Sequence, residues 1–506
     1  MVQHARRHDL SNLRLGRPPE PCGEPPLRFE NRLEEELALA LSVGLDTAVK
    51  ALRAHQLAVD VASHNIANAQ SPGFSRQRVL LRPIGLDGSD HFSRDALLGR
   101  SGFGVDASDV NRVRDVFLDF QLRTNLGARD QNKALSRSLS QAELVFNDPT
   151  DNGLGALMGK FWAAWHDVVN SPESPAARTT LVHSTSTMAT RIQRAHGDLI
   201  AQRADLNRSL GMTADRINAA ASEIASLNFQ IKQVELNGDM ANDLRDRRDL
   251  LLDQLSGIGD ISYSEQPDSS IVVYLGSHEL VFANTAREVK SVADLANPGM
   301  DKLIFTMDDQ DVVTNSGELR GILDARDTAI PGLVAKLDAL AAGLITGVNA
   351  IHAAGFGLDN STGLAFFTGT GASDIALNPV LSTNPHQIAA SSALSAPGDG
   401  SNALAIANLQ LATTMAAGTL TFDEYYGNIV SVLGADVVRA DGLAESADLM
   451  SSHLDQLRQS VSGVNIDEEM TNLNASQHAY EAAARVITTI DEMLETLINR
   501  TGIAGR

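Results

Sequence analysis

The feature that most constrains this fold is a narrow apolar repeat at each end of the chain. Between residues 41 and 66, apolar side chains recur at alternating spacings of four and three, interrupted by His55. The same spacing returns between residues 479 and 497. This is the pattern of a coiled-coil seam. We expect a long helix at each end, and the predicted seam residues are Leu45, Leu52, Val59, Ile66, Val486, Ile490, Met493 and Leu497.

Both predicted helices have clear limits in the sequence. The first must stop near residues 71–74, because Pro72 lacks an amide hydrogen and disfavours helical geometry at the residue before it, while Gly73 permits a turn. At the other end, Asn465 is a good N-cap, and Glu468 three residues later completes an arrangement like a capping box. We therefore expect the second helix to start directly after Asn465.

The chain between these helices has mostly helical periodicity, over residues 110–146, 154–170, 175–256, 317–352 and 401–440. Residues 258–313 differ, because β-branched and aromatic runs there are divided by Pro, Gly and Asp, as in strands. Residues 355–399 are rich in Gly, Ser, Thr, Asn and Pro, which indicates loops and short strands. The predicted fold class is mainly α, with coiled-coil terminal helices, a helical-bundle middle domain and an inserted β-rich domain.

These patterns divide the chain into four parts. Residues 1–36 hold five prolines and little apolar periodicity, so we expect a disordered extension. The predicted terminal coiled-coil domain comprises 37–82 and 445–506, the helical middle domain 83–257, 314–354 and 400–444, and the β-rich outer domain 258–313 and 355–399.

Composition and charge argue against several classes of function. Lys plus Arg is 41 against 63 for Asp plus Glu, a net charge of −22 that would repel nucleic acid. Cys22 is the single cysteine, which excludes an intramolecular disulfide and Cys-rich metal sites. No uninterrupted apolar run reaches the roughly 18 to 20 residues that cross a bilayer, and the N-terminus lacks an ordinary secretory signal. We expect a chain with no nucleic-acid or membrane partner.

Motifs for catalysis or cofactor binding are weak. The segment 153–161 has the wrong spacing for a phosphate loop, and the loop at Asp359 lacks the alternating acidic ligands of a calcium site. The 13 histidines show no metal-binding spacing. We expect no enzyme activity, no catalytic residue, no metal and no cofactor.

The terminal helices are the strongest pointer to function. A long helix with a thin apolar stripe gains most of its stability from packing that stripe against a partner. The two ends can pair with each other and then with neighbouring subunits, giving termini that become ordered on assembly. An intramolecular hairpin with no role in assembly fits the pattern equally well.

The terminal segments also resemble a known family. ALSVGLDTAVKALRAHQLAVDVASHNIANAQSPGFSRQRV resembles the N-terminal signature of bacterial flagellar rod, hook and hook-associated proteins, and SGVNIDEEMTNLNASQHAYEAAARVITTIDEMLETLINR their C-terminal signature. Internal segments such as NDLRDRRDLLLDQLS and GELRGILDARD resemble the members found at the junction of hook and filament. The resemblance runs from about residue 39 to 501, and the motif residues that carry it are Asn65, Asn68, Pro72, Gly73, Phe74 and Asn465.

The resemblance implies a structural role. It suggests a secreted flagellar subunit that forms a ring between hook and filament through its terminal helices. The implied partners are other copies of the chain, the hook protein, a second hook-associated junction protein on the filament side, and an export chaperone at the C-terminal helix. A distal rod or hook subunit is the alternative.

The sequence departs from the family at a few places. His64 and Phe74 stand where the family usually has Asn and Tyr, both mild changes. Residues 1–36 have no counterpart in the family, so we expect a misassigned translation start, which would leave a short chain with little room for a second outer β domain.

Overall fold

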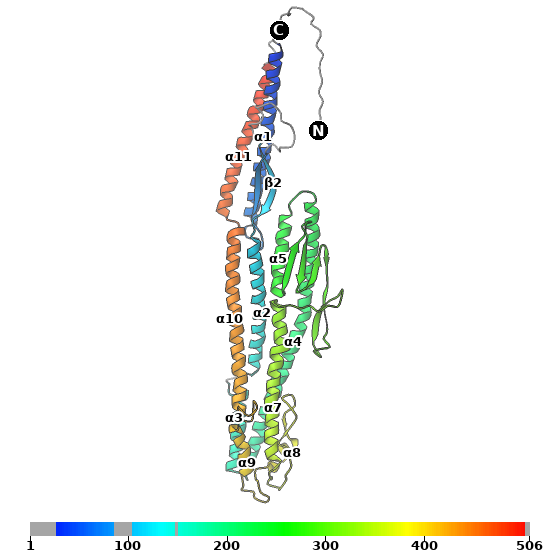
Figure 1. The fold of residues 1–506 in the computed structure, drawn as a ribbon. Coiled ribbons are helices and arrows are strands. Elements are labelled where there is room, and N and C mark those ends of the chain that lie inside the picture. The colour runs from blue at the N-terminus through cyan, green and yellow to red at the C-terminus, as the bar shows by residue number, and fades with distance from the viewer. Residues whose placement is uncertain (1–26, 85–103, 147–149, 501–506) are drawn as a thin grey trace, which may run out of the picture. The chain divides into compact units, whose positions relative to one another are not determined.

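The computed structural model describes residues 27–84, 104–146 and 150–500. Within these ranges the chain is mainly helical with small antiparallel sheets (Figure 1), which confirms the predicted fold class. It divides into two compact units. Unit 1 combines both ends of the chain, namely the residues up to 66, residues 78–110 and the residues from 466 onward, and unit 2 comprises residues 67–77 and 111–465.

Unit 1 is built on two long helices, α1 (Leu27–Asn68) and α11 (Ile466–Arg500), with the strand pair β1 (Gln77–Pro83) and β2 (Val105–Arg112). The predicted stop after α1 and the predicted start of α11 are both confirmed. Residues 27–36, expected to be disordered, belong to α1, whereas the rest of the predicted extension lies outside the described residues.

The long helices of unit 2 are α2 (Val116–Phe146), α3 (Leu154–Asn170), α4 (Pro175–Glu235), α5 (Asn242–Ile258), α7 (Ile330–His352) and α10 (Phe422–Ser462). The shorter helical segments are α6 (Gly317–Asp324), η2 (Ala325–Ala329), α8 (Pro379–Thr383), η3 (Pro385–Gln387), α9 (Ser401–Ala407) and η4 (Asn408–Leu411). The stretch predicted as one helix over 175–256 is two, because the chain turns through Gly238, where φ is positive.

The stretch predicted as a helix over 401–440 is also interrupted. Its first part is α9 and η4, and the long helix α10 begins only at Phe422. A capping box sets that start: Thr421 Oγ1 accepts from the amide of Glu424 at 3.2 Å, and the Glu424 carboxylate accepts from the amide of Thr421 at 2.9 Å. The segment predicted as 110–146 likewise starts as strand β2 and becomes helical only at Val116.

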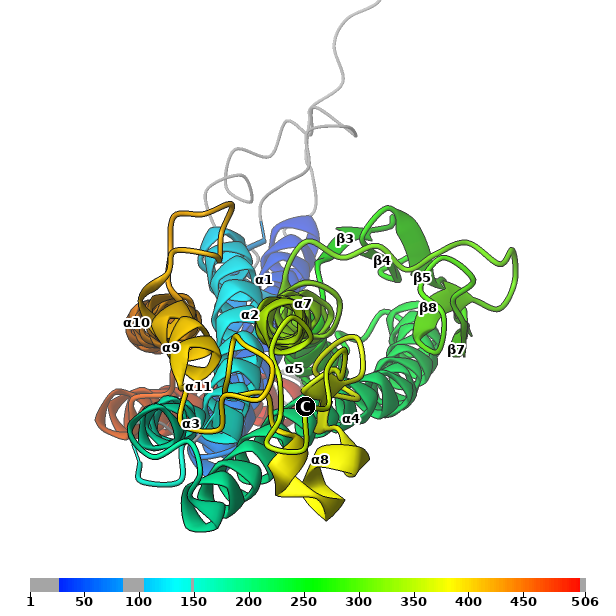
Figure 2. The ribbon, with the colours of Figure 1, turned by 90° about the horizontal axis from the view of Figure 1, so that it is seen from below.

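Strands β3 to β8 of unit 2 lie where the sequence predicted strands, between residues 258 and 313. Antiparallel pairing gives the sheet β3-β4-β5-β6, followed by the hairpin β7-β8. Their bounds are β3 (Ile261–Glu265), β4 (Ile271–Leu275), β5 (His278–Phe282), β6 (Thr285–Ala286), β7 (Val289–Ala293) and β8 (Asp301–Phe305). Figure 2 shows these strands gathered beside α4, away from α3, α9 and α10.

Two hydrophobic cores organise unit 2. The first joins α3, the first half of α4, α7 and α10, and contains both tryptophans, Trp162 and Trp165, which are 1% and 0% exposed. The second joins the later part of α4, α5 and α6 to the strands β3–β8. Residues 355–399, which form the two-residue strands β9 (Phe367–Thr368) and β10 (Ala376–Leu377), contribute to the first core. This differs from the predicted outer domain, which grouped 355–399 with 258–313.

The stretch Gly317–His352 is long and apolar enough to cross a membrane by those two criteria alone. It contains α7, whose Leu337, Leu340, Leu344 and Val348 are each 0% exposed inside the first core. Burial within the protein accounts for the apolar character of this helix, since a core helix passes the same test.

Candidate assembly interface

Helices α1 and α11 run side by side in unit 1 as an antiparallel pair (Figure 1). Two contacts fix their register. Asn65 donates a hydrogen bond to Glu469 at 3.0 Å, and a Cβ placed on Gly44 would lie 3.3 Å from Cδ1 of Ile490. Asn65 and Gly44 are 21 residues apart, as are Ile490 and Glu469, so the two helices stay in step over roughly 30 Å.

Burial along α11 follows a strict heptad pattern. Apart from Ala479 and Ala484, every residue of α11 up to Thr496 is exposed except one stripe with alternating spacings of four and three. That stripe is Glu469, Leu473, Ser476, Tyr480, Ala483, Ile487, Ile490 and Leu494. This confirms that α11 buries a narrow seam, as the sequence predicted.

The register places a stripe of mostly small α1 residues opposite the α11 stripe. Its members share the same spacing and are half-buried or buried: Gly44, Ala48, Ala51, Ala58 and Ala62, together with the larger His55 and Asn65. Small side chains let two helix backbones approach closely, and the larger Tyr, Ile and Leu side chains of α11 fill the space between them. Another side of α1 lies against Gly104, the residue before β2: a Cβ placed on Gly104 would lie 3.1 Å from Cγ2 of Thr47.

The predicted seam residues occupy three kinds of position. Ile490 lies in the buried stripe and is 8% exposed. Leu45, Leu52, Val59 and Ile66 are half-buried, and each directly follows a residue of the α1 stripe. Val486 and Met493 are 49% and 52% exposed and lie one position before Ile487 and Leu494. Leu497 belongs to α11, but its side chain lies outside the described residues.

Val486 and Met493 are exposed apolar side chains of α11, as are Ile466 and Met470 nearer its start. Val486 and Met493 are seven positions apart, so they lie on the same side of α11. Apolar side chains at half exposure beside a buried seam are suited to contact with another helix.

The predicted motif residues at the end of α1 form a tight turn. Asn65 is 0% exposed and bonded to Glu469 as described. The carbonyl of Asn68 accepts from the amide of Ser71 at 2.9 Å, and Gly73 has φ of +79°, a conformation that glycine adopts without strain. Pro72 is exposed, Phe74 is half-buried, and Asn465 directly precedes α11.

The residues after this turn are anchored on α5 within unit 2. The amide of Ser75 donates to Asp246 at 2.8 Å, and Gln77 Nε2 donates to Asp243 at 2.8 Å. Arg112 donates to both Asp246 and Asp249, at 2.8 and 2.7 Å.

A wider ion-pair network surrounds this anchor. Arg114 bonds to Asp119 and Asp249, while Arg123 and Arg458 both bond to Asp253. Sequence reasoning missed this network. The available signal was the alternation of Arg and Asp in NDLRDRRDLLLDQL, which gives α5 an acidic side close to several arginines.

Burial and the neighbouring arginines have opposite effects on the pKa values of Asp246 and Asp249. Burial raises the pKa of Asp246 despite hydrogen bonds from Ser75 and Arg112. Burial also opposes ionisation of Asp249, but the guanidinium groups of Arg114, Arg112 and Arg123 outweigh it and lower the pKa of that carboxyl. Asp249 therefore remains charged and holds the arginines together.

Within the described ranges, no cluster of three or more His, Cys, Asp or Glu side chains could hold a metal ion. The arrangement instead offers helix faces and a salt-bridged anchor, which suit assembly.

Three regions of the chain match known flagellar families. Residues 139–367 match the family described as the flagellar hook-associated protein FlgK helical domain. Residues 45–74 match the flagella basal body rod protein family, and residues 456–500 match the flagellar basal body rod FlgEFG protein C-terminal family. The two terminal matches fall on α1 with its turn and on α11 with the end of α10.

Similar proteins agree with these matches over most of the chain. Flagellar hook-associated protein 1 of Bacillus subtilis (strain 168) is 29% identical over 92% of this chain and 99% of its own length. The protein of the same name from Escherichia coli (strain K12) is 25% identical over 90% of this chain and 99% of its own.

The fold also has a solved counterpart. The flagellar hook junction protein FlgK from Burkholderia pseudomallei has a TM-score of 0.60 and 16% identity, covering 68% of this chain and 100% of that one. Taken with the buried heptad seam and the terminal turn, the matches at both ends and in the middle show that this chain is similar to flagellar hook-associated protein 1 and other flagellar axial proteins over most of its length.

Proposed function

We propose that this chain is a structural subunit of the bacterial flagellum and forms the junction between hook and filament. The observation that carries the proposal is the terminal helix pair, which buries one heptad stripe within the subunit and leaves Val486 and Met493 uncovered. The similarity to flagellar hook-associated protein 1 supports a place for this subunit in the flagellar axis.

The proposal includes a ring of copies whose terminal helices pack side by side. It also includes the hook protein on one side, a second hook-associated junction protein on the filament side, secretion through the flagellar channel, and an export chaperone that binds α11. In this arrangement the predicted terminal coiled-coil domain, residues 37–82 and 445–506, is the part of the subunit that packs against other copies. The residues proposed to make these contacts are Leu45, Leu52, Val59, Ile66, Val486, Met493 and Leu497.

A deletion strain tests the function. We expect such cells to complete their hooks and to carry no filaments, because filament subunits would lack a base on which to polymerise. Electron microscopy of the cells distinguishes this outcome from loss of the hook itself, which would favour a distal rod or hook subunit.

Complementation of the same strain tests the interface. Val486→Asp places a charge on the uncovered apolar side of α11, so we expect few or no filaments. Thr488→Asp is the matched control, since Thr488 is also exposed and residues two apart do not share a helix face. Equal filament counts for the two variants would contradict the assigned contact.

A further inference from the structure

The turn between α4 and α5 carries a reactive pair of residues, Asn237 and Gly238. In an Asn-Gly pair the backbone nitrogen of the glycine can reach the side-chain carbonyl of the asparagine, because glycine has no Cβ to hinder the approach and turns freely. The sequence contains this pair twice, at Asn237-Gly238 and at Asn152-Gly153. The structure treats the two pairs very differently.

The turn at Asn237 projects into solvent. Residues 236–240, which directly follow α4, are all exposed. Gly238 has φ of +89°, and a Cβ placed on it would meet no described atom within 4 Å beyond its chain neighbours. Water therefore has access to this peptide group, and the chain has room to turn.

Two hydrogen bonds hold the reactive groups in place. The amide of Gly238 donates to the carbonyl of Glu235 at 3.1 Å, and Nδ2 of Asn237 donates to the carbonyl of Gln233 at 3.0 Å. Both bonds lie at the exposed end of a helix, where opening costs little because helix ends fray and water replaces the lost partner. Neither bond keeps the nitrogen of Gly238 away from the side chain of Asn237 for long.

The second pair is protected by the first core. Gly153 is buried, its amide donates to the carbonyl of Thr150 at 3.0 Å, and its carbonyl accepts from the amide of Leu157 at 3.1 Å. The first turn of α3 follows it directly and contains Leu154 and Met158, which are 1% and 0% exposed. The same rearrangement at Gly153 would require this turn to leave the core.

We infer that Asn237 is a site of spontaneous deamidation. The nitrogen of Gly238 loses its proton to hydroxide and attacks Cγ of Asn237. A carbon–nitrogen bond forms in a five-membered succinimide ring, while the bond from Cγ to Nδ2 breaks and ammonia leaves. Water then opens the ring: addition at the side-chain carbonyl gives aspartate, and addition at the main-chain carbonyl gives isoaspartate. The sequence of steps uses only water and hydroxide.

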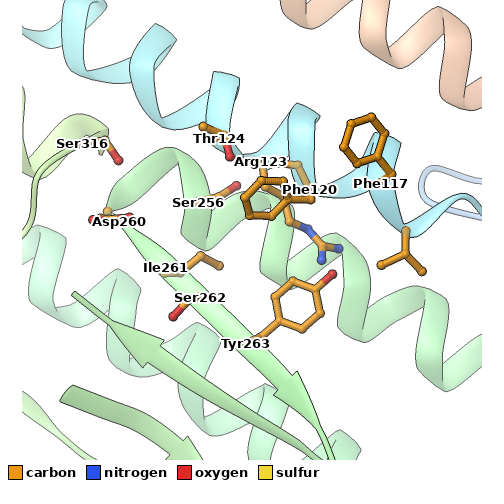
Figure 3. A pocket seen from close by; sticks show the side chains of 12 residues that line it. Phe117, Phe120, Arg123, Thr124, Ser256, Asp260, Ile261, Ser262, Tyr263 and Ser316 are labelled. Atoms are coloured by element: carbon orange, nitrogen blue, oxygen red, sulfur yellow. Dashed lines mark hydrogen bonds between the residues drawn. The ribbon is translucent and has the colours of Figure 1, made fainter. Parts of the chain in front are cut away.

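The surroundings of the turn allow the product to form in a folded chain. Arg245 of α5 donates from Nε and Nη2 to the carboxylate of Glu235 at 2.7 and 2.9 Å, so an ion pair spans the reacting residues. The far end of α5, at Ser256, lines an apolar pocket of about 570 Å³ (Figure 3), roughly 20 Å along the helix from its start. The reaction adds a carboxylate at one end of α5 and leaves the other end unchanged.

The modification goes beyond the proposed function, although that function gives it a consequence. A copy held between hook and filament could not be replaced without releasing the filament. The modified fraction would therefore rise with the age of the flagellum. The reaction itself depends only on the folded chain, so it can be measured without any assembly.

Peptide mass spectrometry of the purified full-length chain tests the inference. The protein is incubated at pH 8, once folded and once in urea, and is then digested with trypsin. Cleavage after Lys232 and Arg245 isolates the turn. Replacement of the amide NH2 by OH gives a mass increase that fragmentation assigns to one residue, and an enzyme that methylates isoaspartate measures that product.

The pair at Asn152 is the internal reference. In the folded chain we expect Asn237 to react at least about tenfold faster than Asn152, because only the latter needs the opening of a packed helix. In urea the two sites should react at similar rates, since both are Asn-Gly pairs. Asn237→Gln should abolish the mass increase at this turn, because glutamine would have to close a six-membered ring. Asn152→Gln is the matched control and should leave the reaction of Asn237 unchanged.

The remaining outcomes separate the inference from the proposed function. Equal rates at the two sites in the folded chain overturn the inference, as does an unreactive Asn237 under conditions in which the unfolded chain reacts. Flagella kept from cells that no longer grow should contain a modified fraction that rises with time, and a constant fraction in flagella that contain the chain overturns the accumulation. Flagella that lack the chain refute the proposed function and leave the result for the purified protein in force.

Discussion

At the scale of single residues, the buried pair Asn65 and Glu469 sets the register of unit 1. Both residues are almost fully buried, at 0% and 3% exposed, in a seam whose other members, apart from His55 and Tyr480, are small or apolar. A polar residue at one seam position specifies register, because any shift of the helices would bury it without its hydrogen bond. The registers of α1 and α11 are thus coupled near their junction with the rest of the chain.

Replacing Asn65 with alanine should destabilise this helix pair by about 1 to 3 kcal/mol, since the hydrogen bond to the Glu469 carboxylate is lost. Hydrogen exchange of α11 amides measures the change. Ser63→Ala, at an exposed neighbour, is the control and should leave exchange almost unchanged. Equal protection in both variants would show that Asn65 does not hold the register.

His352 has a different role, inside the first core of unit 2. It is 1% exposed, with Nδ1 2.7 Å from the carbonyl of Leu364 and Nε2 accepting from the amide of Ala389 at 3.0 Å. Burial lowers the pKa of His352 to about 4, with the charge of Arg178 acting in the same direction. The folded protein therefore keeps this imidazole neutral.

This histidine should make unit 2 sensitive to acid. Its pKa is about 4 when folded and about 6.5 when unfolded, so its contribution to stability is present above pH 6.5 and is lost as the pH falls toward 4. The loss should approach about 3 kcal/mol. Urea unfolding at pH 7 and 4.5, followed by tryptophan fluorescence, measures it. His352→Gln should show a smaller loss than the parent protein, and equal losses would contradict the assignment.

At the scale of elements, the heptad spacing could be read from the sequence, but six of the eight predicted seam residues lie one position away from the buried stripes: Leu45, Leu52, Val59, Ile66, Val486 and Met493. Apolar residues stand side by side at Val486-Ile487 and at Met493-Leu494, so two stripes share Ala483 and Ile490 and fit almost equally well. The buried stripe depends on the small residues of α1 opposite it, and a single helix carries no information about its partner.

Ile490 lies in both versions of the seam, which makes it a direct test of the helix pair. Ile490→Asp buries a charge against Gly44, so we expect α1 and α11 to separate and lose helical content in the free subunit. Circular dichroism measures this loss. Tryptophan fluorescence should stay that of the parent, because Trp162 and Trp165 lie in unit 2. Unchanged helical content would mean that the pair does not depend on Ile490.

The ion pairs that anchor residues 75–77 and Arg112 on α5 could not be predicted from the sequence, because their partners are distant along the chain. Asp246 meets Ser75 and Arg112 across 171 and 134 residues of chain. Spacing rules describe neighbours on one helix, whereas these partners are set by how separate segments fold together. The strands between 258 and 313, the end of α1 and the start of α11 could be predicted because their signals are local, whereas the start of α1 falls in residues that were expected to be disordered.

At the scale of the whole molecule, the two units differ in how much they bury. Unit 2 has two extended hydrophobic cores, whereas the fully described side chains of unit 1 supply Ala48, Ala54, Ala62, Ala483 and Ile490 as buried apolar residues. Since burial of apolar area is the main source of stability, unit 1 should be the weaker of the two.

We therefore expect two unfolding transitions in the free subunit. Circular dichroism reports the helices of both units, while tryptophan fluorescence reports unit 2 alone. On addition of urea, part of the helical signal should be lost at a lower concentration than the one that changes fluorescence, because coincident probes are expected only for a single cooperative transition. Superimposable curves would indicate that the units unfold together.

The bond between Asn65 and Glu469 joins positions 404 residues apart. At a synthesis rate of about 5 to 20 residues per second, Glu469 of α11 is added roughly 20 to 80 seconds after Asn65 of α1. Passage of the unfolded chain through a narrow channel has the same effect, because one of the two terminal helices always emerges after the rest of the chain. Unit 2 is nearly continuous in sequence and can finish folding during that delay. The pairing of α1 with α11 is therefore the last step, whether the chain folds during synthesis or after passage through a channel.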